Sequence, residues 1–381
     1  MPSRTLLTGA KLCLPSEVVS DAALLIEGGR IAAIGAASAD FDGDRRDFAG
    51  HTVYAGFIDT HVHGGLEHDV MDATPEALAA IGQHLARHGV TGWLATTVAC
   101  PAAQLDAILT AVARAMASPH GAPILGAHLE SNFLAAKYKG AQPAEHLRAP
   151  DDAELLAVIE RHKATIRVVT LAPELPGAMQ LIAQLVAWGI QPSIGHTDAT
   201  YDQVKAAHGA GATRVTHLCN AQRGLHHREP GVVGAALTLD LYAEVIADLQ
   251  HLHPAVVEIA YRCKGASKLV LVSDALRGTG LPPGEYELGG QRTTLDGRVA
   301  KLADGTIAGS VVTLGRAVAN CAEACNVPWA AAAAMAAATP ARSLGLTDRG
   351  ELVVGQRADL AVLDAGGACV ATMIEGLWVS R

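Results

Sequence analysis

The chain has 381 residues, of which 50% are hydrophobic and 18% are charged, and its formal net charge is −9. This length accommodates one large domain, or one large and one small domain, with a sizeable core. The negative charge, without any basic cluster, argues against nucleic acid and against an anionic membrane as the main partner.

The sequence favours a cytoplasmic location. Residues 1–6 lack a charged region followed by a long apolar core, so we expect no signal peptide. The longest apolar run, residues 329–338, is far short of the ~20 residues that span a bilayer. The seven cysteines are widely spread without a CxxC pair, which is typical of reduced thiols inside cells.

Both ends of the chain contain short strand-like runs. Near the N-terminus these are residues 6–14, 22–26 and 31–34, with a Gly28-Gly29 turn signal before the last run. Near the C-terminus they are residues 352–354, 359–363 and 372–379, separated by glycine turns. This pattern predicts one small β-sandwich domain assembled from residues 1–55 and 350–381.

The middle of the chain, residues 56–349, alternates between strand-like and helical segments. The strand-like runs are residues 53–58, 93–98, 124–130, 166–172, 192–196, 214–218, 243–249 and 269–274. The helical segments that separate most of them include residues 74–89, 151–162, 179–188, 201–208 and 254–263. Eight strands alternating with helices predict an α/β fold of the (β/α)8 TIM-barrel type. Residues 284–305 interrupt the alternation and predict a β-hairpin insertion, because they contain two Asp-Gly turns.

An open doubly wound sheet is the alternative architecture. It is disfavoured because no GxGxxG motif follows the first strand. Histidines or acidic residues stand instead at the ends of the first, third, fifth, sixth and eighth strands. A barrel brings these strand ends together at its C-terminal mouth, where active sites of this architecture lie.

The first of these strand ends carries His61 and His63, separated by one residue. Alternate side chains of a strand share a face, so the two imidazoles should point in the same direction. Neutral imidazoles placed side by side are good ligands for a borderline divalent metal. The pair is a weak signal alone, since the chain has 17 histidines.

The other strand ends strengthen the metal hypothesis. Glu130, His196 and His217 supply a carboxylate and two imidazoles, a ligand set that leaves room for water as in an open catalytic zinc site. Asp274 ends the eighth strand, where a carboxylate can accept a proton from water and later deliver it to a leaving amine. His128 shares a strand face with Glu130, and we expect it to fill the barrel interior.

This constellation resembles the amidohydrolase superfamily and, within it, the N-acetylglucosamine-6-phosphate deacetylase family. The resemblance covers essentially the whole chain. It is carried by residues 56–64, 128–130, 195–199, 216–221, 226–231, 246–248, 251, 273–275 and 308–310.

The resemblance implies roles for individual residues. Glu130, His196 and His217 would bind the principal metal, His61 and His63 match members that hold a second ion, and Asp274 matches the catalytic acid/base. The implied cofactor is one or two divalent ions, zinc first, with iron, cobalt or manganese as alternatives. The implied substrate-binding residues are Ala141, Gln142, Asn220, Ala221, Arg228, His251, Ile307, Ala308 and Gly309. Family members are commonly homodimers in which the arginine and the histidine reach a neighbouring subunit's site.

Three departures from the family pattern fall on parts that contact substrate. Glu130 is followed by Ser131-Asn132 where the family has Gly-Pro, and Gln142 replaces a histidine that contacts the substrate. Gln222 and Leu249 also stand where methionine and glycine are usual. The substrate could therefore be a different phosphorylated amino sugar, or another N-acyl compound.

The sequence thus predicts metal-dependent hydrolysis of the acetamide of an N-acetylated hexosamine 6-phosphate. One alternative is an amidohydrolase that acts on a different N-acyl or cyclic amide. Another is a non-enzymatic scaffold on the same fold, although such a chain should have lost metal ligands. No nucleic acid or membrane partner is expected.

Overall fold

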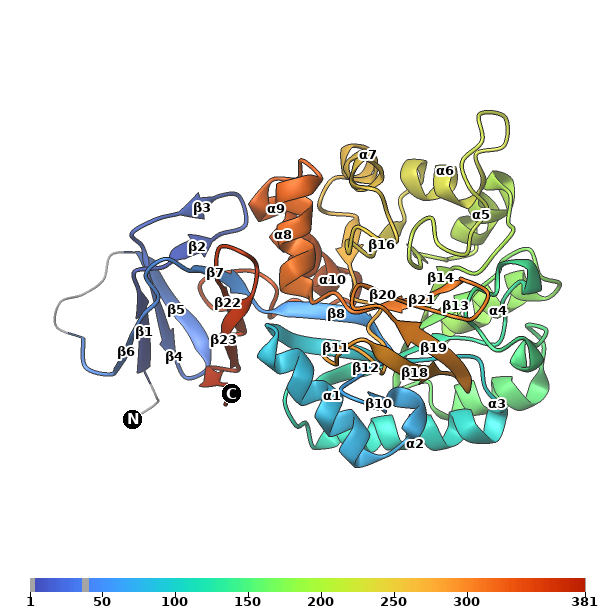
Figure 1. Ribbon diagram of the computed structural model, residues 1–381, viewed down its shortest axis with the longest axis horizontal. Coiled ribbons are helices and arrows are strands. Elements are labelled where there is room, and N and C mark those ends of the chain that lie inside the picture. Colours follow the sequence, from blue (N-terminus) through green and yellow to red (C-terminus); the bar gives the residue numbers. More distant parts are fainter. Residues whose placement is uncertain (1–3, 36–40, 381) are drawn as a thin grey trace.

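Eight parallel strands form the centre of the molecule and are surrounded by helices (Figure 1). The computed structural model describes residues 4–35 and 41–380. The barrel strands are β8 (Phe57–Val62), β11 (Val90–Thr97), β12 (Ile124–Glu130), β13 (Ile166–Leu171), β14 (Gln191–Ile194), β15 (Arg214–Val215), β16 (Tyr242–Val245) and β17 (Leu269–Leu271). Each strand pairs with its neighbour in the chain, and a parallel bridge between Val62 and Ala275 brings the last strand end back to the first. The predicted barrel is confirmed.

Helices cover the outside of this barrel. They are α1 (Pro75–Arg87), α2 (Ala102–Ala117), α3 (Ala153–Arg161), α4 (Ala178–Ala187), α5 (Tyr201–Gly209), α6 (Gly231–Thr238), α7 (Pro254–Lys264), α8 (Leu314–Ala324), α9 (Trp329–Ala336) and α10 (Ala338–Ser343). Local sequence sets several starts: Thr74 caps α1 through the backbone N–H of Ala77 at 3.2 Å, with Pro75 at the first helical position. Among the helices of the described ranges, none combines the length and apolar character needed to cross a membrane.

The small β domain contains strands from both ends of the chain. One sheet has the order β5 (Arg30–Gly35), β4 (Ala23–Glu27), β1 (Arg4–Thr8) and β6 (Asp44–Asp47). The other has the order β24 (Leu377–Trp378), β23 (Cys369–Ile374), β22 (Leu360–Leu363), β7 (Thr52–Ala55), β2 (Lys11–Cys13) and β3 (Val18–Val19). These strands fall within residues 1–55 and 350–381. Residues 1–3, 36–40 and 381 of those ranges lie outside the described residues, and they include part of the N-terminal segment, residues 1–6, where we expect no signal peptide.

Some expected strand boundaries were wrong, and glycine explains two of them. The expected strand 53–58 is divided at Gly56, so that residues 52–55 join the small domain and the barrel strand begins at Phe57. A Cβ on Gly56 would lie 2.3 Å from the Thr91 side chain, so only glycine allows the chain to pass this point. The expected run 6–14 is similarly divided by Gly9, whose φ is +74°. Residues 352–354 form no strand.

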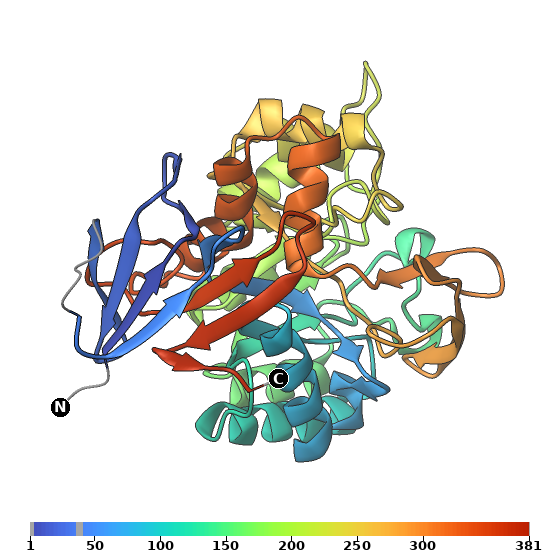
Figure 2. The same cartoon turned by 60° about the vertical axis from the view of Figure 1, so that its left-hand side comes forward.

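The insertion is larger than the expected hairpin. It is a four-stranded antiparallel sheet made of β18 (Gly284–Leu288), β19 (Gln291–Leu295), β20 (Val299–Lys301) and β21 (Ile307–Ser310). Figure 2 shows it on the side of the barrel away from the small β domain. An isolated bridge between Ala275 and Ser310 ties β21 to the end of the last barrel strand. The insertion is therefore fixed beside the barrel mouth.

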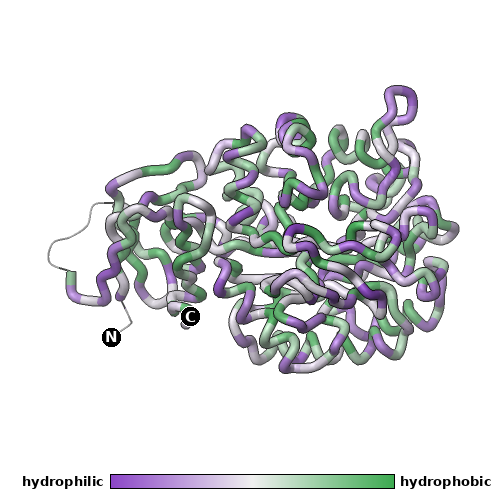
Figure 3. Tube along the Cα trace, in the orientation of Figure 1, coloured by the Kyte–Doolittle hydropathy of each residue, from purple (hydrophilic) through white to green (hydrophobic). Residues whose placement is uncertain are grey.

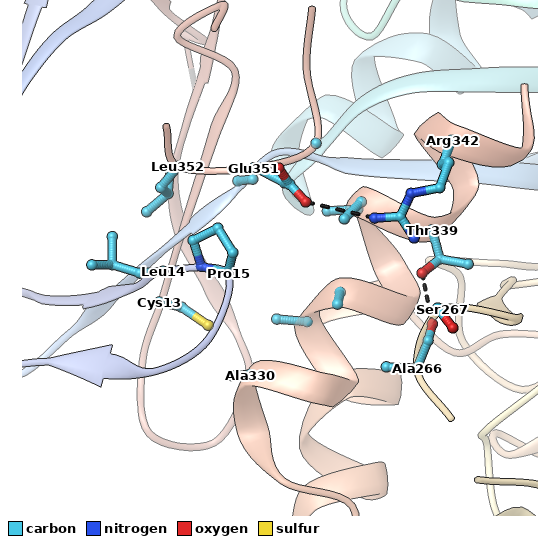
Figure 4. A pocket seen from close by; sticks show the side chains of 16 residues that line it. Cys13, Leu14, Pro15, Ala266, Ser267, Ala330, Thr339, Arg342, Glu351 and Leu352 are labelled. Carbon is cyan, nitrogen blue, oxygen red and sulfur yellow. Dashed lines mark hydrogen bonds and ion pairs between the residues drawn. The ribbon is translucent and has the colours of Figure 1, made fainter. Parts of the chain in front are cut away.

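The two domains meet along a groove lined by an alanine-rich face of α9 and α10 (Figure 4). Leu14, Pro15 and Leu352 of the small domain line its other side. The Arg342 guanidinium and the Glu351 carboxylate approach to 3.6 Å at this groove. Small side chains on the helices allow the small domain to approach the barrel closely.

Candidate active site

The polar strand ends converge at one point of the barrel mouth, and backbone hydrogen bonds fix their positions. The N–H of Asp274 donates to the carbonyl of His61 at 3.0 Å, and the N–H of His63 donates to the carbonyl of Ala275 at 2.8 Å. The end of the eighth strand is thereby locked to the end of the first. The buried carboxylate of Asp59 accepts the N–H of Ser273 at 3.2 Å and reinforces the same closure.

Glu130, His196 and His217 form one compact group of donor atoms. The Oε1 atom of Glu130 lies 2.8 Å from the Nε2 atom of His196 and 2.8 Å from that of His217. The two Nε2 atoms are 3.1 Å apart. All three side chains are at least nine-tenths buried.

His61, His63 and Asp274 form a second group next to the first. The Nε2 atoms of the two histidines are 3.2 Å apart, and the Oδ1 atom of Asp274 lies 3.4 Å and 3.2 Å from them. His61 Nε2 is also 3.8 Å from Glu130 Oε1, and His63 Nε2 is 3.6 Å from Glu130 Oε2. Glu130 therefore stands between the two groups.

The outer ring nitrogens explain why the inner ones face each other. Nδ1 of His196 lies 2.9 Å from the carbonyl oxygen of Tyr138, and Nδ1 of His217 lies 3.2 Å from that of Asn220. A carbonyl can only accept, so we assign the proton of each ring to Nδ1. Each Nε2 then presents a lone pair to the centre, which is the tautomer that binds a metal.

The donor set fits a divalent cation. Lone pairs on nitrogens 3.1–3.2 Å apart repel one another unless a cation lies between them. Burial alone would lower the pKa of His61, but the charges of Asp274 and Glu130 and the hydrogen bond to Glu244 outweigh it and raise the pKa to about 10. A tetrahedral zinc ion with bonds of about 2.0 Å separates its ligand atoms by about 3.3 Å. The observed separations of 2.8–3.4 Å are close to that value.

Asp274 is held in its ionised form. Burial raises the pKa of this carboxyl, but the charge of His61 and the hydrogen bond from His63 oppose burial and hold the pKa below its usual value. An ionised carboxylate at the mouth is able to accept a proton.

Three of the site residues have strained backbones. The φ angles of His196, His217 and Asp274 are +48°, +28° and +50°, in a region that non-glycine residues rarely adopt. Each lies just beyond its strand, since β14, β15 and β17 end at residues 194, 215 and 271. Strain of this kind, of order 1–3 kcal/mol each, is typical of functional sites.

His128 fills the barrel interior. Its Nδ1 atom lies 3.1 Å from the carbonyl oxygen of Thr60, and its Nε2 atom lies 2.7 Å from the hydroxyl of Thr170. Burial lowers the pKa of His128 to about 3, so the ring is neutral. Both ring nitrogens are engaged by the protein, and neither is presented to the donor groups above.

A cleft of about 510 Å³ opens above the donor atoms. The predicted substrate-binding residues that line it are Ala141, Gln142, Asn220, Ala221, His251, Ile307 and Gly309. Ala308 lies instead in a small apolar cluster with Val98 and Leu288. The insertion contributes Asp304 and Thr306 to the cleft wall.

The structure does not bring Arg228 into the cleft of its own chain. The residue is exposed on the loop between β15 and α6, which projects from the barrel (Figure 1) and is hydrophilic towards its tip (Figure 3). Its guanidinium lies 2.7 Å from a ring nitrogen of His227. His251 does reach the cleft, and its Nδ1 atom pairs with the Asp248 carboxylate at 2.7 Å.

Gln142 makes its hydrogen bonds to the protein. Its amide N–H donates to Glu130, and its carbonyl accepts the N–H of Ala99 at 2.8 Å. The side chain is buried at the edge of the cleft. The departure from the family histidine therefore lies directly beside a candidate metal ligand.

Sequence reasoning missed three polar residues of this region. Glu244 and Arg214 lie beneath the donor atoms and are fully buried, and Lys139 lines the cleft. A charge inside an otherwise apolar strand, as in Ala243-Glu244-Val245, was the available signal for Glu244. A charge buried in a strand needs a partner, which sequence spacing did not identify.

Comparison with known proteins agrees with this architecture. A model of the Amidohydrolase family matches residues 52–381. An N-acetylglucosamine-6-phosphate deacetylase of Vibrio furnissii is 43% identical over 84% of this chain and 81% of its own length. An N-acetylgalactosamine-6-phosphate deacetylase of Escherichia coli O157:H7 is 42% identical over 81% and 83%.

A solved structure is similar over its full length. It is the N-acetyl-D-glucosamine-6-phosphate deacetylase of Mycobacterium smegmatis, as a mutant in complex with N-acetyl-D-glucosamine-6-phosphate. The identity is 36%, the TM-score is 0.93, and 100% of both chains is covered. The chain therefore belongs to the amidohydrolase family, in the branch that contains the N-acetylhexosamine-6-phosphate deacetylases.

Proposed function

We propose that the protein hydrolyses the acetamide of an N-acetylated hexosamine 6-phosphate, giving the amino-sugar phosphate and acetate. The observation that carries this proposal is the group of Glu130, His196 and His217 beside the ionised Asp274, at the floor of a cleft. The named activities of the relatives, on both gluco and galacto substrates, support the substrate class.

Glu130, His196 and His217 would hold the principal divalent ion, with His61, His63 and Asp274 as candidates for a second. When bound, such an ion polarises a carbonyl and lowers the pKa of water. Asp274 takes the proton of the water that attacks the acetamide carbon. The same carboxyl then delivers that proton to the nitrogen as the carbon–nitrogen bond breaks and acetate leaves.

The phosphate end of the substrate would lie near His251. The Asp248 carboxylate pairs with Nδ1 of this histidine and leaves Nε2 for the ligand. Asn220 and Ala221 line the same cleft and would contribute donors. We propose a homodimer in which Arg228, on its projecting loop, reaches the cleft of the partner subunit, since an arginine fork suits a phosphate.

The departure at Gln142 would act through Glu130. Because its amide donates to that carboxylate, a change here alters the orientation of a candidate metal ligand before it alters a substrate contact.

None of the seven cysteines, all within the described ranges, forms a disulfide. This is in keeping with the cytoplasmic location that we propose.

The first prediction concerns the metal. His217→Asn should remove a ligand and sharply lower the divalent metal content of the purified protein, measured by elemental analysis. His128→Asn is the matched control, since both ring nitrogens of this buried histidine are hydrogen-bonded to Thr60 and Thr170, and the change should leave the metal content per folded chain unchanged. Equal metal content in wild type and His217→Asn would contradict the assignment, and a wild type without metal would favour a scaffold.

The second prediction concerns Asp274. Asp274→Asn keeps the size of the side chain and removes the base, so kcat should fall by roughly 100-fold or more. The principal ion should remain bound, because its three ligands are intact. A variant that lost metal in proportion to activity would show that Asp274 acts only as a ligand.

The third prediction concerns phosphate selection. His251→Ala should lower kcat/KM for the 6-phosphorylated sugar but not for the free sugar, because one charged hydrogen bond of about 1.5–3 kcal/mol is lost. The control is Gln250→Ala, an exposed neighbour on the same loop. A loss of the same size on both sugars would mean that His251 supports the fold of the cleft and does not bind phosphate.

A further inference from the structure

A buried pair of charges lies directly beneath the candidate metal ligands. Glu244 on β16 and Arg214 on β15 are 0% exposed, and their Oε1 and Nη2 atoms are 3.1 Å apart. Arg214 Nη2 also donates to the Thr60 hydroxyl at 3.1 Å, and its Nη1 donates to the Ser343 hydroxyl at 3.0 Å. The guanidinium is thus fixed from both sides of the barrel interior.

The free side of the Glu244 carboxylate faces His61. Its Oε2 atom lies 3.1 Å from Nδ1 of that histidine and accepts the backbone N–H of His217 at 3.4 Å. One oxygen of the carboxylate therefore contacts Arg214, and the other contacts the candidate ligands His61 and His217. The carboxylate connects the barrel core to the donor atoms of the mouth.

His61 differs from the other three histidines of the site in this respect. The outer nitrogens of His196 and His217 face backbone carbonyls. The Nδ1 atom of His63 is buried without a protein partner. Of these four histidines, His61 is the one whose outer ring nitrogen is hydrogen-bonded to a carboxylate. A carboxylate partner fixes the tautomer of a ligating imidazole and makes it a stronger donor.

We propose that Glu244 is a positioning residue for the second ion of this site, and that Arg214 is the charge that holds it. The carboxylate keeps the proton of His61 on Nδ1, so that Nε2 stays available beside His63 and Asp274. Arg214 makes this arrangement tolerable, since a buried carboxylate without a counter-charge is strongly unfavourable. This proposal shares one assumption with the proposed function, namely that His61, His63 and Asp274 form an ion site.

The contacts of Glu244 also explain why loss of its charge should weaken the binding of only one of the two ions. The rings of the principal candidate ligands His196 and His217 are oriented by the carbonyls of Tyr138 and Asn220. Glu244 also accepts the backbone N–H of His217 at 3.4 Å, and the amide oxygen in Glu244→Gln can still accept it. Loss of the Glu244 charge should therefore weaken the second ion selectively. Removal of such a carboxylate partner typically costs 10–100-fold in metal affinity.

The test is a titration of metal-stripped protein with zinc against a competing chelator dye, which gives two dissociation constants. Glu244→Gln keeps the shape of the side chain and an acceptor for His61 but removes the charge. Glu244→Gln combined with Arg214→Met removes both charges, so no uncompensated arginine is left in the core. Thr170→Val is the matched control, because it removes two buried hydrogen bonds of the barrel interior, to His128 and to Thr216, and neither is a bond to His61.

We expect the weaker constant to rise by about 10–100-fold in both Glu244 variants, while the tighter constant stays as in wild type and in Thr170→Val. The proposal is overturned if neither constant changes, if both rise together, or if wild type binds a single ion. If Glu244→Gln alone does not fold, the constants measured for the variant that also carries Arg214→Met decide whether the proposal holds. A wild type that binds two ions but releases no acetate would refute the proposed function and leave this inference standing.

Discussion

The structure depends on one constraint: several candidate metal ligands are buried at one point, and the protein places too little positive charge there to balance their lone pairs and negative charges. Four imidazole nitrogens and the carboxylates of Glu130 and Asp274 converge here, and neighbouring atoms of this set are 2.8–3.8 Å apart. Protonation of some rings relieves this repulsion in part, as the raised pKa of His61 indicates. A divalent cation relieves it fully, because the lone pairs of His61, His196 and His217 are already directed inward by a hydrogen bond on the opposite side of each ring.

The fold holds this unfavourable arrangement in place. The closure between β8 and the end of β17 fixes His61, His63 and Asp274 through backbone hydrogen bonds. His196, His217 and Asp274 adopt positive φ angles directly after short strands, which turns their side chains into the mouth. The barrel core and the small domain share one hydrophobic cluster, and it supplies the stability that this local strain requires.

Sequence reasoning identified the parts of the fold that depend on local pattern. Strand β12 was predicted with its observed boundaries and ends at Glu130, because all seven residues of its strand-like run, 124–130, belong to the strand. The later barrel strands were predicted too long, since strained residues such as His217 continue an apolar pattern while the backbone has already left the strand. The insertion was predicted as a hairpin but is a four-stranded sheet. Its third and fourth strands, β20 and β21, have only three and four residues and were not recognised in the sequence.

The candidate ligands could be named from sequence because strand ends in a barrel must meet. The contacts that support these ligands could not be predicted from sequence, because they join residues that are far apart in the chain. Gln142 was expected to face the substrate, yet its amide is bound to Glu130 and its carbonyl to Ala99. Glu244 is 183 residues from His61, and no spacing rule connects them. Arg228 was linked to the phosphate, yet the structure leaves it exposed and outside the cleft of its own chain.

Release of acetate tests the account most directly. Metal-loaded protein would be given N-acetylglucosamine 6-phosphate, N-acetylgalactosamine 6-phosphate and the two unphosphorylated sugars, with chelator-stripped protein alongside. The account predicts acetate from at least one of the phosphorylated sugars, far slower release from its free counterpart, and none from stripped protein until metal is restored. Equal rates on free and phosphorylated sugars, or full activity in stripped protein, would contradict it.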